Sequence, residues 1–306
     1  MSTSVRRVVL VTGATGGQGG SAAIEILKRG IGVRALVRDS EIDSERARSL
    51  AAAGAELVKG SFADPASLEA AMHGVQAVFS MQPDGAPDAD FRALLDAAVG
   101  AGVEQYVHSS VSGVREQESV LERLEGDMKQ EYWRAKVNQE RGVRAAPFRY
   151  RTYLRPSLII DNMVLRAQFM YPRLATEGDL LVAMKPDQPV SLVSYDTIGR
   201  VAAAAFADPE RFDNAEIELA DEYVSHAQLA AALEEVTGKP VTVTSADMDK
   251  AIEMGLAPRV AHSHRWLTDV GYPARPEMLA RYHIEPLPIR DWVRRHVDQI
   301  RIGSRR

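Results

Sequence analysis

The sequence predicts an α/β fold, with a doubly wound parallel sheet followed by a smaller C-terminal lobe of α+β structure. In the first half, short β-branched runs alternate with helical stretches, as in repeated strand–helix–strand units. The first run leads directly into a glycine-rich turn. After residue 155 the alternation gives way to longer connections and proline-rich turns.

Six apolar runs are predicted to be strands of this sheet. Most of them are apolar on both faces, which is expected when helices cover both sides of a parallel sheet. The runs are residues 8–12, 33–37, 56–59, 77–80, 105–109 and 151–154.

Capping residues delimit the helices between these strands. The first helix is expected over residues 21–29, and Gly30 then supplies a left-handed C-cap. Asp64 and Pro65 suit the N-cap and the first position of a later helix. A further helix is expected over residues 126–142.

The chain is expected to divide near residue 155. Residues 1–155 are assigned to the sheet domain and residues 156–306 to the C-terminal lobe, whose clearest internal break is the segment 185–189 with its two prolines. A helix over residues 196–207 is expected to pack back on the sheet. In that case the lobe would not be an independent unit.

Composition excludes several classes of function. The 306 residues carry a formal net charge of −5, with a pI of about 5.9, and include no cysteine. Disulfides, thiolate metal sites and a cysteine nucleophile are therefore excluded, and the charge gives no sign of a nucleic-acid partner. The start lacks the pattern of a signal peptide, and the longest apolar run, 201–207, is too short to span a bilayer. We expect a cytoplasmic protein with no membrane partner.

The strongest chemical signal is the glycine-rich turn after the first strand. Gly13, Gly16 and Gly19 allow a sharp turn, a close approach of a pyrophosphate and tight packing of helix on strand. The start of the helix then offers N–H groups and a positive dipole end to the phosphates. Thr15 and Gln18 belong to the same segment and are further candidates. The turn predicts dinucleotide binding, and a purely structural turn is the alternative.

The end of the second strand indicates which dinucleotide is preferred. An acidic side chain there accepts from the 2′-hydroxyl of NAD, whereas the 2′-phosphate of NADP needs a cation. Val37 occupies the acidic position and Arg38 follows, so NADP(H) is favoured. Arg34 is a second candidate. In the alternative, Arg38 is solvated and Asp39 accepts from the ribose.

Beyond these motifs, most of the chain resembles the NmrA-like branch of the atypical short-chain dehydrogenase/reductase superfamily. The resemblance implies a Rossmann domain that binds NADP(H) and a C-terminal lobe that forms the substrate cleft. Members include reductases of quinones, azo and triphenylmethane dyes and plant phenolics, and also dinucleotide-sensing regulators without a reaction. The segments that carry it are residues 8–20, 33–39, 54–60, 78–80, 106–110, 154–156, 161–163, 196–199 and 271–272.

The resemblance also implies a catalytic pair. Reductases of this superfamily use a tyrosine as proton donor and a lysine four residues later, which here are Tyr132 and Lys136. On a helix these positions share a face. A free phenol has a pKa of about 10, and a nearby ammonium favours its anion. In the alternative, Tyr132 and Trp133 pack the helix on the sheet while Lys136 is solvated or pairs with Glu140. Even then Lys136 would be a cofactor contact.

Further site residues are expected at the strand ends, where ligands bind in such folds. Ser109, Ser110 and Ser112 compete for the third catalytic position after the fifth strand, and Ser110 and Ser112 are favoured. Gln82, after the fourth strand, is expected to lie along the cofactor.

The third strand departs from the family pattern. The related reductases have an aspartate after the glycine at this strand end, contacting adenine, whereas this chain has Ser61. Ser61 and Phe62 are the candidates for this contact, and Asp64 could take over part of it.

On the substrate side, Asn162, Met163 and Phe169 are expected to line the cleft, with packing of the lobe as the alternative. A mostly apolar lining suits a flat aromatic ligand. His262 and His264 lack partners at metal-ligand spacing, so no metal is expected, and a surface or substrate-loop role is favoured for them.

Together these features predict an NADPH-dependent reductase of a small apolar carbonyl, enone or quinone-like substrate, acting as a monomer or homodimer. The alternative is a regulatory protein that senses NADP(H) without catalysing a reaction. The Tyr132 and Lys136 pair favours the reductase.

Overall fold

The computed structural model describes residues 7–83, 85–119 and 130–303. The chain forms two compact units. The first comprises Met1–Arg155 and Tyr195–Ile217, and the second comprises Pro156–Ser194 and Glu218–Arg306. The helix that was expected over residues 196–207 is therefore grouped with the first unit.

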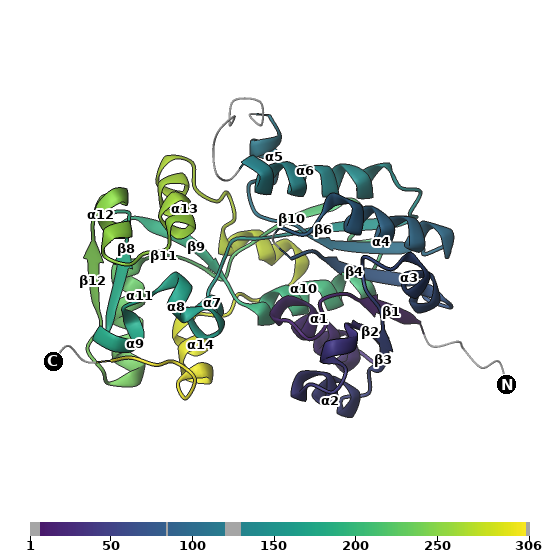
Figure 1. The fold of residues 1–306 in the computed structure, drawn as a ribbon, viewed down its shortest axis with the longest axis horizontal. Coiled ribbons are helices and arrows are strands. Elements are labelled where there is room, and N and C mark those ends of the chain that lie inside the picture. The colour runs from purple at the N-terminus through teal and green to yellow at the C-terminus, as the bar shows by residue number, and fades with distance from the viewer. Residues whose placement is uncertain (1–6, 84, 120–129, 304–306) are drawn as a thin grey trace. The chain divides into compact units, whose positions relative to one another are not determined.

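The first unit alternates strands and helices along most of its length (Figure 1). Its elements, including the two strands at its boundary, are β1 (Val8–Val11), α1 (Gly17–Lys28), β2 (Gly32–Val37), η1 (Asp39–Glu41), α2 (Glu45–Ala52), β3 (Glu56–Lys59), α3 (Pro65–Met72), β4 (Ala77–Met81), α4 (Asp88–Gly100), β5 (Gln105–Ser109), α5 (Val114–Glu118), α6 (Gln130–Ala145), β6 (Tyr150–Pro156), α10 (Tyr195–Ala207) and β10 (Ala215–Leu219).

The seven-stranded sheet of this unit has the order β10-β6-β5-β4-β1-β2-β3. The pairs β1–β2, β2–β3, β1–β4, β4–β5 and β5–β6 are all parallel, which confirms the predicted Rossmann-type sheet. The strand order reverses between β1 and β4. In folds of this kind, ligands bind beside the carboxyl ends of the strands at such a reversal.

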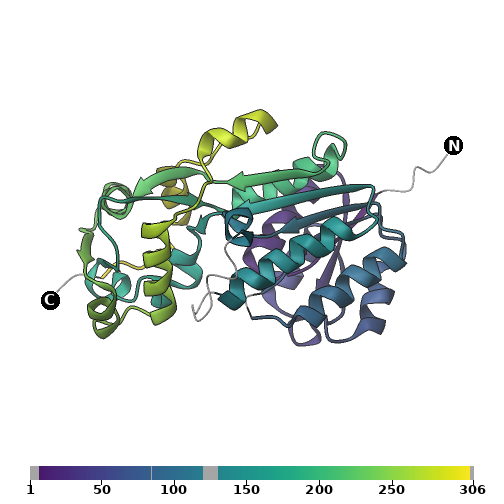
Figure 2. The same cartoon turned by 90° about the horizontal axis from the view of Figure 1, so that it is seen from above.

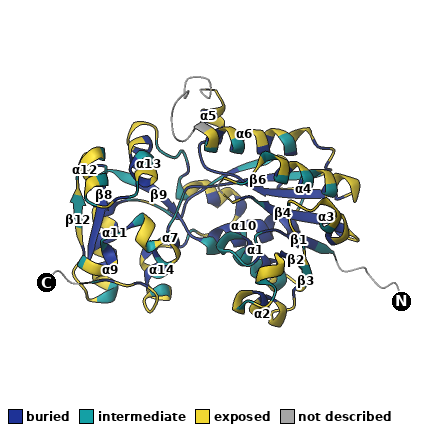
Figure 3. Cartoon of the chain, in the orientation of Figure 1, coloured by how far each residue is buried: buried dark blue, intermediate teal, exposed yellow. Residues whose placement is uncertain are grey.

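Helices cover both faces of this sheet. Helices α1 and α10 pack against each other, while α4 packs against both α3 and α6. The blue and teal helices α3, α4 and α6 lie side by side in Figure 2. The sheet strands are mostly buried and the outer faces of the helices exposed (Figure 3). Val9, Leu10 and Val11 of β1 are each 0% exposed, as expected for a strand covered on both sides.

Several predicted helix ends are confirmed. The Asp64 side chain accepts from the Ser67 N–H at 3.3 Å and Pro65 is the first residue of α3. Gly30 follows α1 with φ +76°, the left-handed conformation that glycine adopts without strain.

Two helix starts differ from the sequence prediction. Helix α1 starts at Gly17 rather than at residue 21, because the turn closes at Gly16 and the next glycines already adopt helical geometry. Helix α6 covers Gln130–Ala145, and the part expected over residues 126–129 lies outside the described residues.

The second unit contains two small sheets. Strand β9 pairs antiparallel with β11 and parallel with β7, and β8 pairs parallel with β12. Its elements are β7 (Leu158–Ile159), α7 (Asn162–Leu165), α8 (Ala167–Met170), α9 (Leu174–Glu177), β8 (Asp179–Val182), β9 (Pro189–Val193), β11 (Glu222–Ser225), α11 (His226–Thr237), β12 (Thr242–Ser245), α12 (Met248–Glu253), α13 (Pro258–Asp269), η3 (Pro276–Tyr282) and α14 (Ile289–His296).

Buried polar contacts stabilise this second unit. The fully buried Trp292 donates from its indole nitrogen to Asp161 at 3.2 Å. Asp221 is also buried and accepts from the backbone N–H groups of Ser194 and Leu287, each at 2.7 Å. Each carboxylate therefore links segments far apart in the sequence.

The surface position expected for His264 is wrong. This side chain is 2% exposed, and its Nδ1 accepts from the Ala183 N–H at 3.0 Å. The sequence pattern did not reveal that α13 turns this position into the core of the unit. Within the described ranges, no group of three or more potential metal-ligating side chains is assembled, and no helix is long and apolar enough to cross a membrane.

Candidate functional site

The glycine-rich turn between β1 and α1 forms a tight backbone cradle. Gly13 has φ +60°, and the Gly16 N–H donates to the Gly13 carbonyl at 2.8 Å. A Cβ at position 19 would overlap the carbonyl oxygens of Thr12 and Gly13, so helix and strand cross closely there. Gly16 provides no side-chain cap for α1. The first turn of α1 thus opens with N–H groups that no N-cap side chain covers, a geometry suited to phosphate oxygens.

Two polar side chains of this turn contact other parts of the first unit. The Thr15 hydroxyl donates to Glu41 at 2.8 Å. Gln18 accepts at its Oε1 from the Ser109 hydroxyl at 2.6 Å. The structure therefore brings the turn together with the ends of β2 and β5.

Arg38, directly after β2, lies close to Thr15. Its side chain is 71% exposed and donates to the Glu41 carboxylate at 2.5 Å and 3.3 Å. The hydrogen bond from Arg38 lowers the pKa of Glu41, so this carboxylate is ionised at neutral pH. Arg46 donates to the Thr15 carbonyl at 3.0 Å. This end of the sheet holds two arginines and a hydroxyl around one acid.

The other two candidates at this strand have partners elsewhere. Arg34 donates to Glu56 at 2.8 Å and to the carbonyl of His73 at 2.6 Å. Asp39 forms an exposed ion pair of 2.6 Å with Lys59. Of the side chains considered for the ribose, Arg38 is therefore the one joined through Glu41 to the glycine-rich turn.

Two buried polar side chains at the ends of β4 and β5 have no hydrogen-bond partner within the described residues. Neither the oxygen nor the nitrogen of the Gln82 amide has a hydrogen-bond partner among the described residues, and Gln82 is 4% exposed. The Ser110 hydroxyl also lacks a partner among them, and Ser110 is 5% exposed. Because buried polar groups are rarely left unpaired, such groups at a strand-order reversal fit a site completed by a ligand. With the glycine cradle, they suit a dinucleotide.

Tyr132 and Lys136 are neighbours on α6. The Lys136 ammonium lies 5.8 Å from the centroid of the Tyr132 ring. Lys136 is 7% exposed and Tyr132 is half-buried, with its ring against Trp133 at a centroid distance of 5.3 Å. On β5, burial first and the positive charge of Lys136 second lower the pKa of His108 to about 3. The Lys136 side chain is therefore largely removed from water, and its charge acts on His108 of β5.

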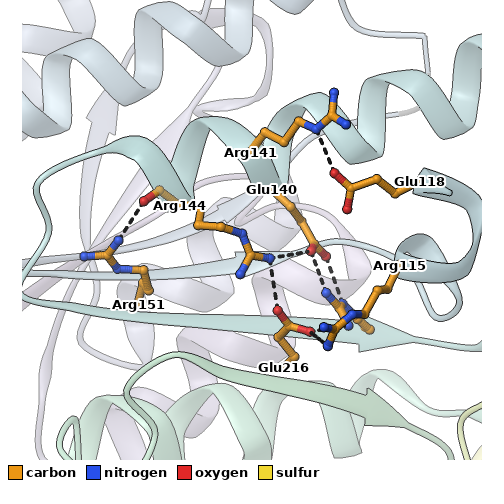
Figure 4. A network of polar contacts seen from close by, with 8 residues as sticks. Arg115, Glu118, Glu140, Arg141, Arg144, Arg151 and Glu216 are labelled. Carbon is orange, nitrogen blue, oxygen red and sulfur yellow. Dashed lines mark hydrogen bonds and ion pairs between the residues drawn. The ribbon is translucent and has the colours of Figure 1, made fainter.

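A network of charged side chains fixes α6 on the edge of the sheet (Figure 4). Both oxygens of Glu140 accept from Arg155 of β6, at 3.0 Å and 2.7 Å, and both residues are buried. Arg155 and Arg144 also pair with Glu216 of β10, at 2.9 Å and 3.0 Å. Glu140, the acid considered as a partner for Lys136, is thus bound at both oxygens by Arg155.

The remaining predicted residues of the first unit lie in different surroundings. Ser61 is exposed, and its hydroxyl accepts from the Ala63 N–H at 3.2 Å. Phe62 packs against the hydrophobic core under the sheet. Ser112 is 0% exposed. Their roles toward a ligand stay predictions.

The three predicted substrate residues lie on α7 and α8 of the second unit. Met163 is 2% exposed, Asn162 is half-buried and Phe169 is 42% exposed. Of the three, Phe169 is the one that offers a large accessible apolar surface. That they line a substrate site stays a prediction.

Sequence reasoning missed two groups near this site. One is Glu41, whose position three residues after Arg38 in a turn is the signal that would have suggested the pair. The other is His108, which is fully buried and shares a hydrogen bond of 3.1 Å between its Nδ1 and the Ser80 hydroxyl. Nothing in the sequence distinguishes that histidine from an apolar strand residue.

Comparison with known proteins agrees with this architecture. A model of the NmrA-like family matches residues 6–287, nearly the whole chain. The chain belongs to the NmrA-like family. Among its curated relatives is an NAD(P)H azoreductase of Xenophilus azovorans, 28% identical over 246 residues that cover 80% of this chain and 79% of that protein.

Solved structures share the NmrA-like fold. The triphenylmethane reductase of Citrobacter sp., solved with NADP(H), has a TM-score of 0.72 and 20% identity, covering 94% of this chain and 99% of that one. NmrA itself, a negative transcriptional regulator solved with NADP, has a TM-score of 0.71 and 20% identity, covering 94% of each chain. The fold is thus shared by an enzyme and a regulator.

Proposed function

We propose that this NmrA-like protein is an NADPH-dependent reductase of a small apolar carbonyl, enone or quinone-like substrate. The observation that carries the proposal is the buried Lys136 side chain, whose ammonium lies 5.8 Å from the centroid of the Tyr132 ring on the same helix. From this position Lys136 could stabilise a phenolate at Tyr132 and hold a ribose of the bound cofactor.

Different residues of the first unit would bind different parts of the cofactor. The turn from Gly13 to Gly19 would hold the pyrophosphate on backbone N–H groups. Arg38 would bind the 2′-phosphate through its guanidinium fork. The Gln82 amide, buried without a partner within the described residues, would gain one from the bound dinucleotide.

NADPH held by these residues would provide the hydride for the proposed reaction. Tyr132 would donate its phenolic proton to the substrate oxygen that gains negative charge. Lys136 would stabilise the phenolate left behind, and Ser110 would donate a hydrogen bond to the same substrate oxygen. With one hydride and one proton added, a ketone would give an alcohol, a quinone a hydroquinone, and an enone an enol that tautomerises to the saturated ketone, with NADP⁺ as the other product.

The names of the relatives support this assignment. The Xenophilus azovorans protein is an NAD(P)H azoreductase, and the Citrobacter enzyme is a triphenylmethane reductase solved with NADP(H). The two names describe the reduction of azo and of triphenylmethane compounds, and the predicted apolar lining would suit ligands with aromatic rings.

The test is to mix the purified protein with NADPH and a panel of quinones, enones and ketones, and to follow the loss of NADPH absorbance. We expect turnover above background with at least one conjugated substrate. NADPH binding in a separate titration, with no turnover across the panel, would contradict the reductase and support the sensing alternative.

A further inference from the structure

The Glu41 carboxylate occupies an anion site at the end of β2. Its Oε2 accepts from the Thr15 hydroxyl at 2.8 Å and from Arg38 Nε at 3.3 Å, while its Oε1 accepts from Arg38 Nη2 at 2.5 Å. Three donors from two segments thus converge on one carboxylate. A fourth group, Arg46, binds the carbonyl of the same threonine at 3.0 Å.

The same donors are those that a phosphate would require. A guanidinium fork and a hydroxyl bind phosphate oxygens as readily as carboxylate oxygens. Arg38 is the residue proposed to bind the 2′-phosphate, and Glu41 already binds two of its three guanidinium nitrogens, Nε and Nη2. An ionised carboxylate and a phosphate dianion repel each other, so both cannot occupy Nε and Nη2 of Arg38 and the Thr15 hydroxyl together.

We propose that Glu41 is a specificity-determining residue that mimics the 2′-phosphate and must leave Nε and Nη2 of Arg38 before the phosphate can bind that edge of the guanidinium. This inference rests on the proposed use of NADPH. NADH carries a hydroxyl where NADPH carries the phosphate, so Glu41 can keep its place beside NADH and accept from that hydroxyl. Glu41 thus reduces the preference for NADPH over NADH that Arg38 creates, so the protein binds both dinucleotides.

The exposure of this pair makes the displacement feasible. The Arg38 side chain is 71% exposed and that of Glu41 is 31% exposed. Ion pairs of this kind are weak, with an upper value that corresponds to a change of about five-fold in an equilibrium constant. The expected effect is therefore a change in cofactor ratio rather than an all-or-none switch.

The experiment is a calorimetric titration of the wild-type protein and of Glu41→Gln with NADPH and with NADH. Glutamine keeps the length of the side chain and removes its charge. Glu41→Gln should bind NADPH about five-fold more tightly while its affinity for NADH changes by less than about two-fold. The matched control is Glu45→Gln, which removes the same charge from an exposed position on α2.

Two further titrations locate the effect. Adenosine 2′,5′-bisphosphate and adenosine 5′-monophosphate both lack the nicotinamide, and only the first carries a 2′-phosphate. Glu41→Gln should therefore bind the bisphosphate more tightly than the wild-type protein does, and the monophosphate equally well. The gain should also shrink as the salt concentration rises, because the contact is exposed.

Each contrary result has its own meaning. An unchanged ratio of NADPH to NADH affinity in Glu41→Gln, or an equal shift in Glu45→Gln, would overturn the role of Glu41 and leave the proposed function standing. A wild-type protein that binds neither dinucleotide would overturn both.

Discussion

Arg38 is the single side chain on which the expected preference for NADPH depends. It follows β2 directly, and its guanidinium is joined through Glu41 to Thr15 in the glycine-rich turn. The other arginine of the strand, Arg34, is bound to Glu56 and to backbone carbonyls. Its position beside the glycine-rich turn therefore selects Arg38.

Arg38→Ala should weaken NADPH binding by about 10- to 100-fold and NADH binding by less than about two-fold, because a hydrogen bond to a charged group contributes about 1.5–3 kcal/mol. Calorimetric titration with each dinucleotide measures this. Arg48→Ala, an exposed arginine on α2, is the control for net charge. Equal losses for both dinucleotides would mean that another residue binds the 2′-phosphate.

At the scale of elements, the first unit depends on the close packing of α1 against α10. Gly199 of α10 lies so near Ser21 of α1 that an added Cβ would overlap the serine hydroxyl and lie 2.8 Å from its carbonyl oxygen. Gly17 faces the Tyr195 ring in the same way. Small residues at these crossings allow the two helices to approach on one face of the sheet.

Gly199→Ala should therefore lower the free energy of unfolding by about 1–3 kcal/mol, the usual effect of overpacking. Urea denaturation followed by circular dichroism measures it. Gly100→Ala, in α4, is the matched control, because no atom lies within 4 Å of its added Cβ and alanine favours the helix. Equal effects of the two changes would contradict the close packing of α1 on α10.

The charged network of Figure 4 is the second feature at this scale. Glu140 and Arg155 are both buried, and they join α6, which carries Tyr132 and Lys136, to β6. Glu140→Gln should lower the free energy of unfolding by about 1–3 kcal/mol, because Arg155 would lose one of its two charged partners and keep Glu216.

The double variant Glu140→Leu/Arg155→Met tests the same network by removing both charges of the pair instead of one. It should be less destabilised than Glu140→Gln alone, as measured by urea denaturation. Additive losses would contradict a direct pair.

At the scale of the whole molecule, stability should depend on two buried histidines. Burial lowers the pKa of His226 to about 4 and is the main cause that lowers that of His108 to about 3. Neither nitrogen of His226 has a hydrogen-bond partner within the described residues. Below pH 6.5 the unfolded chain therefore binds protons that the folded chain does not, and stability falls as the pH falls.

Between pH 6.5 and pH 4 the free energy of unfolding should fall by about 2–3 kcal/mol less in His226→Phe than in the wild-type protein, and the part due to His108 should remain. Urea denaturation at several pH values measures the slope. His73→Phe, at an exposed position, should leave the slope unchanged. A wild-type slope in His226→Phe would show that its ring is not held neutral in the fold.

Much of the first unit could be predicted from the sequence because its signals are local. The parallel sheet, the Asp64 cap and the glycine turn each depend on neighbouring residues. The contacts that sequence reasoning missed join distant segments, such as Thr15 with Glu41 or His264 with Ala183. A histidine that packs into a core carries no local signal, and periodicity alone does not reveal it.

The most direct test of the proposed reaction compares Tyr132→Phe with the wild-type protein on one conjugated substrate under saturating NADPH. We expect kcat to fall by about 10²–10⁴-fold, while the Kd for NADPH changes by less than about two-fold. Tyr150→Phe, a tyrosine whose hydroxyl donates to Glu210 at 3.5 Å, serves as the matched control and should retain the wild-type rate. Equal rates in Tyr132→Phe and wild type would contradict the assignment of Tyr132 as the proton donor.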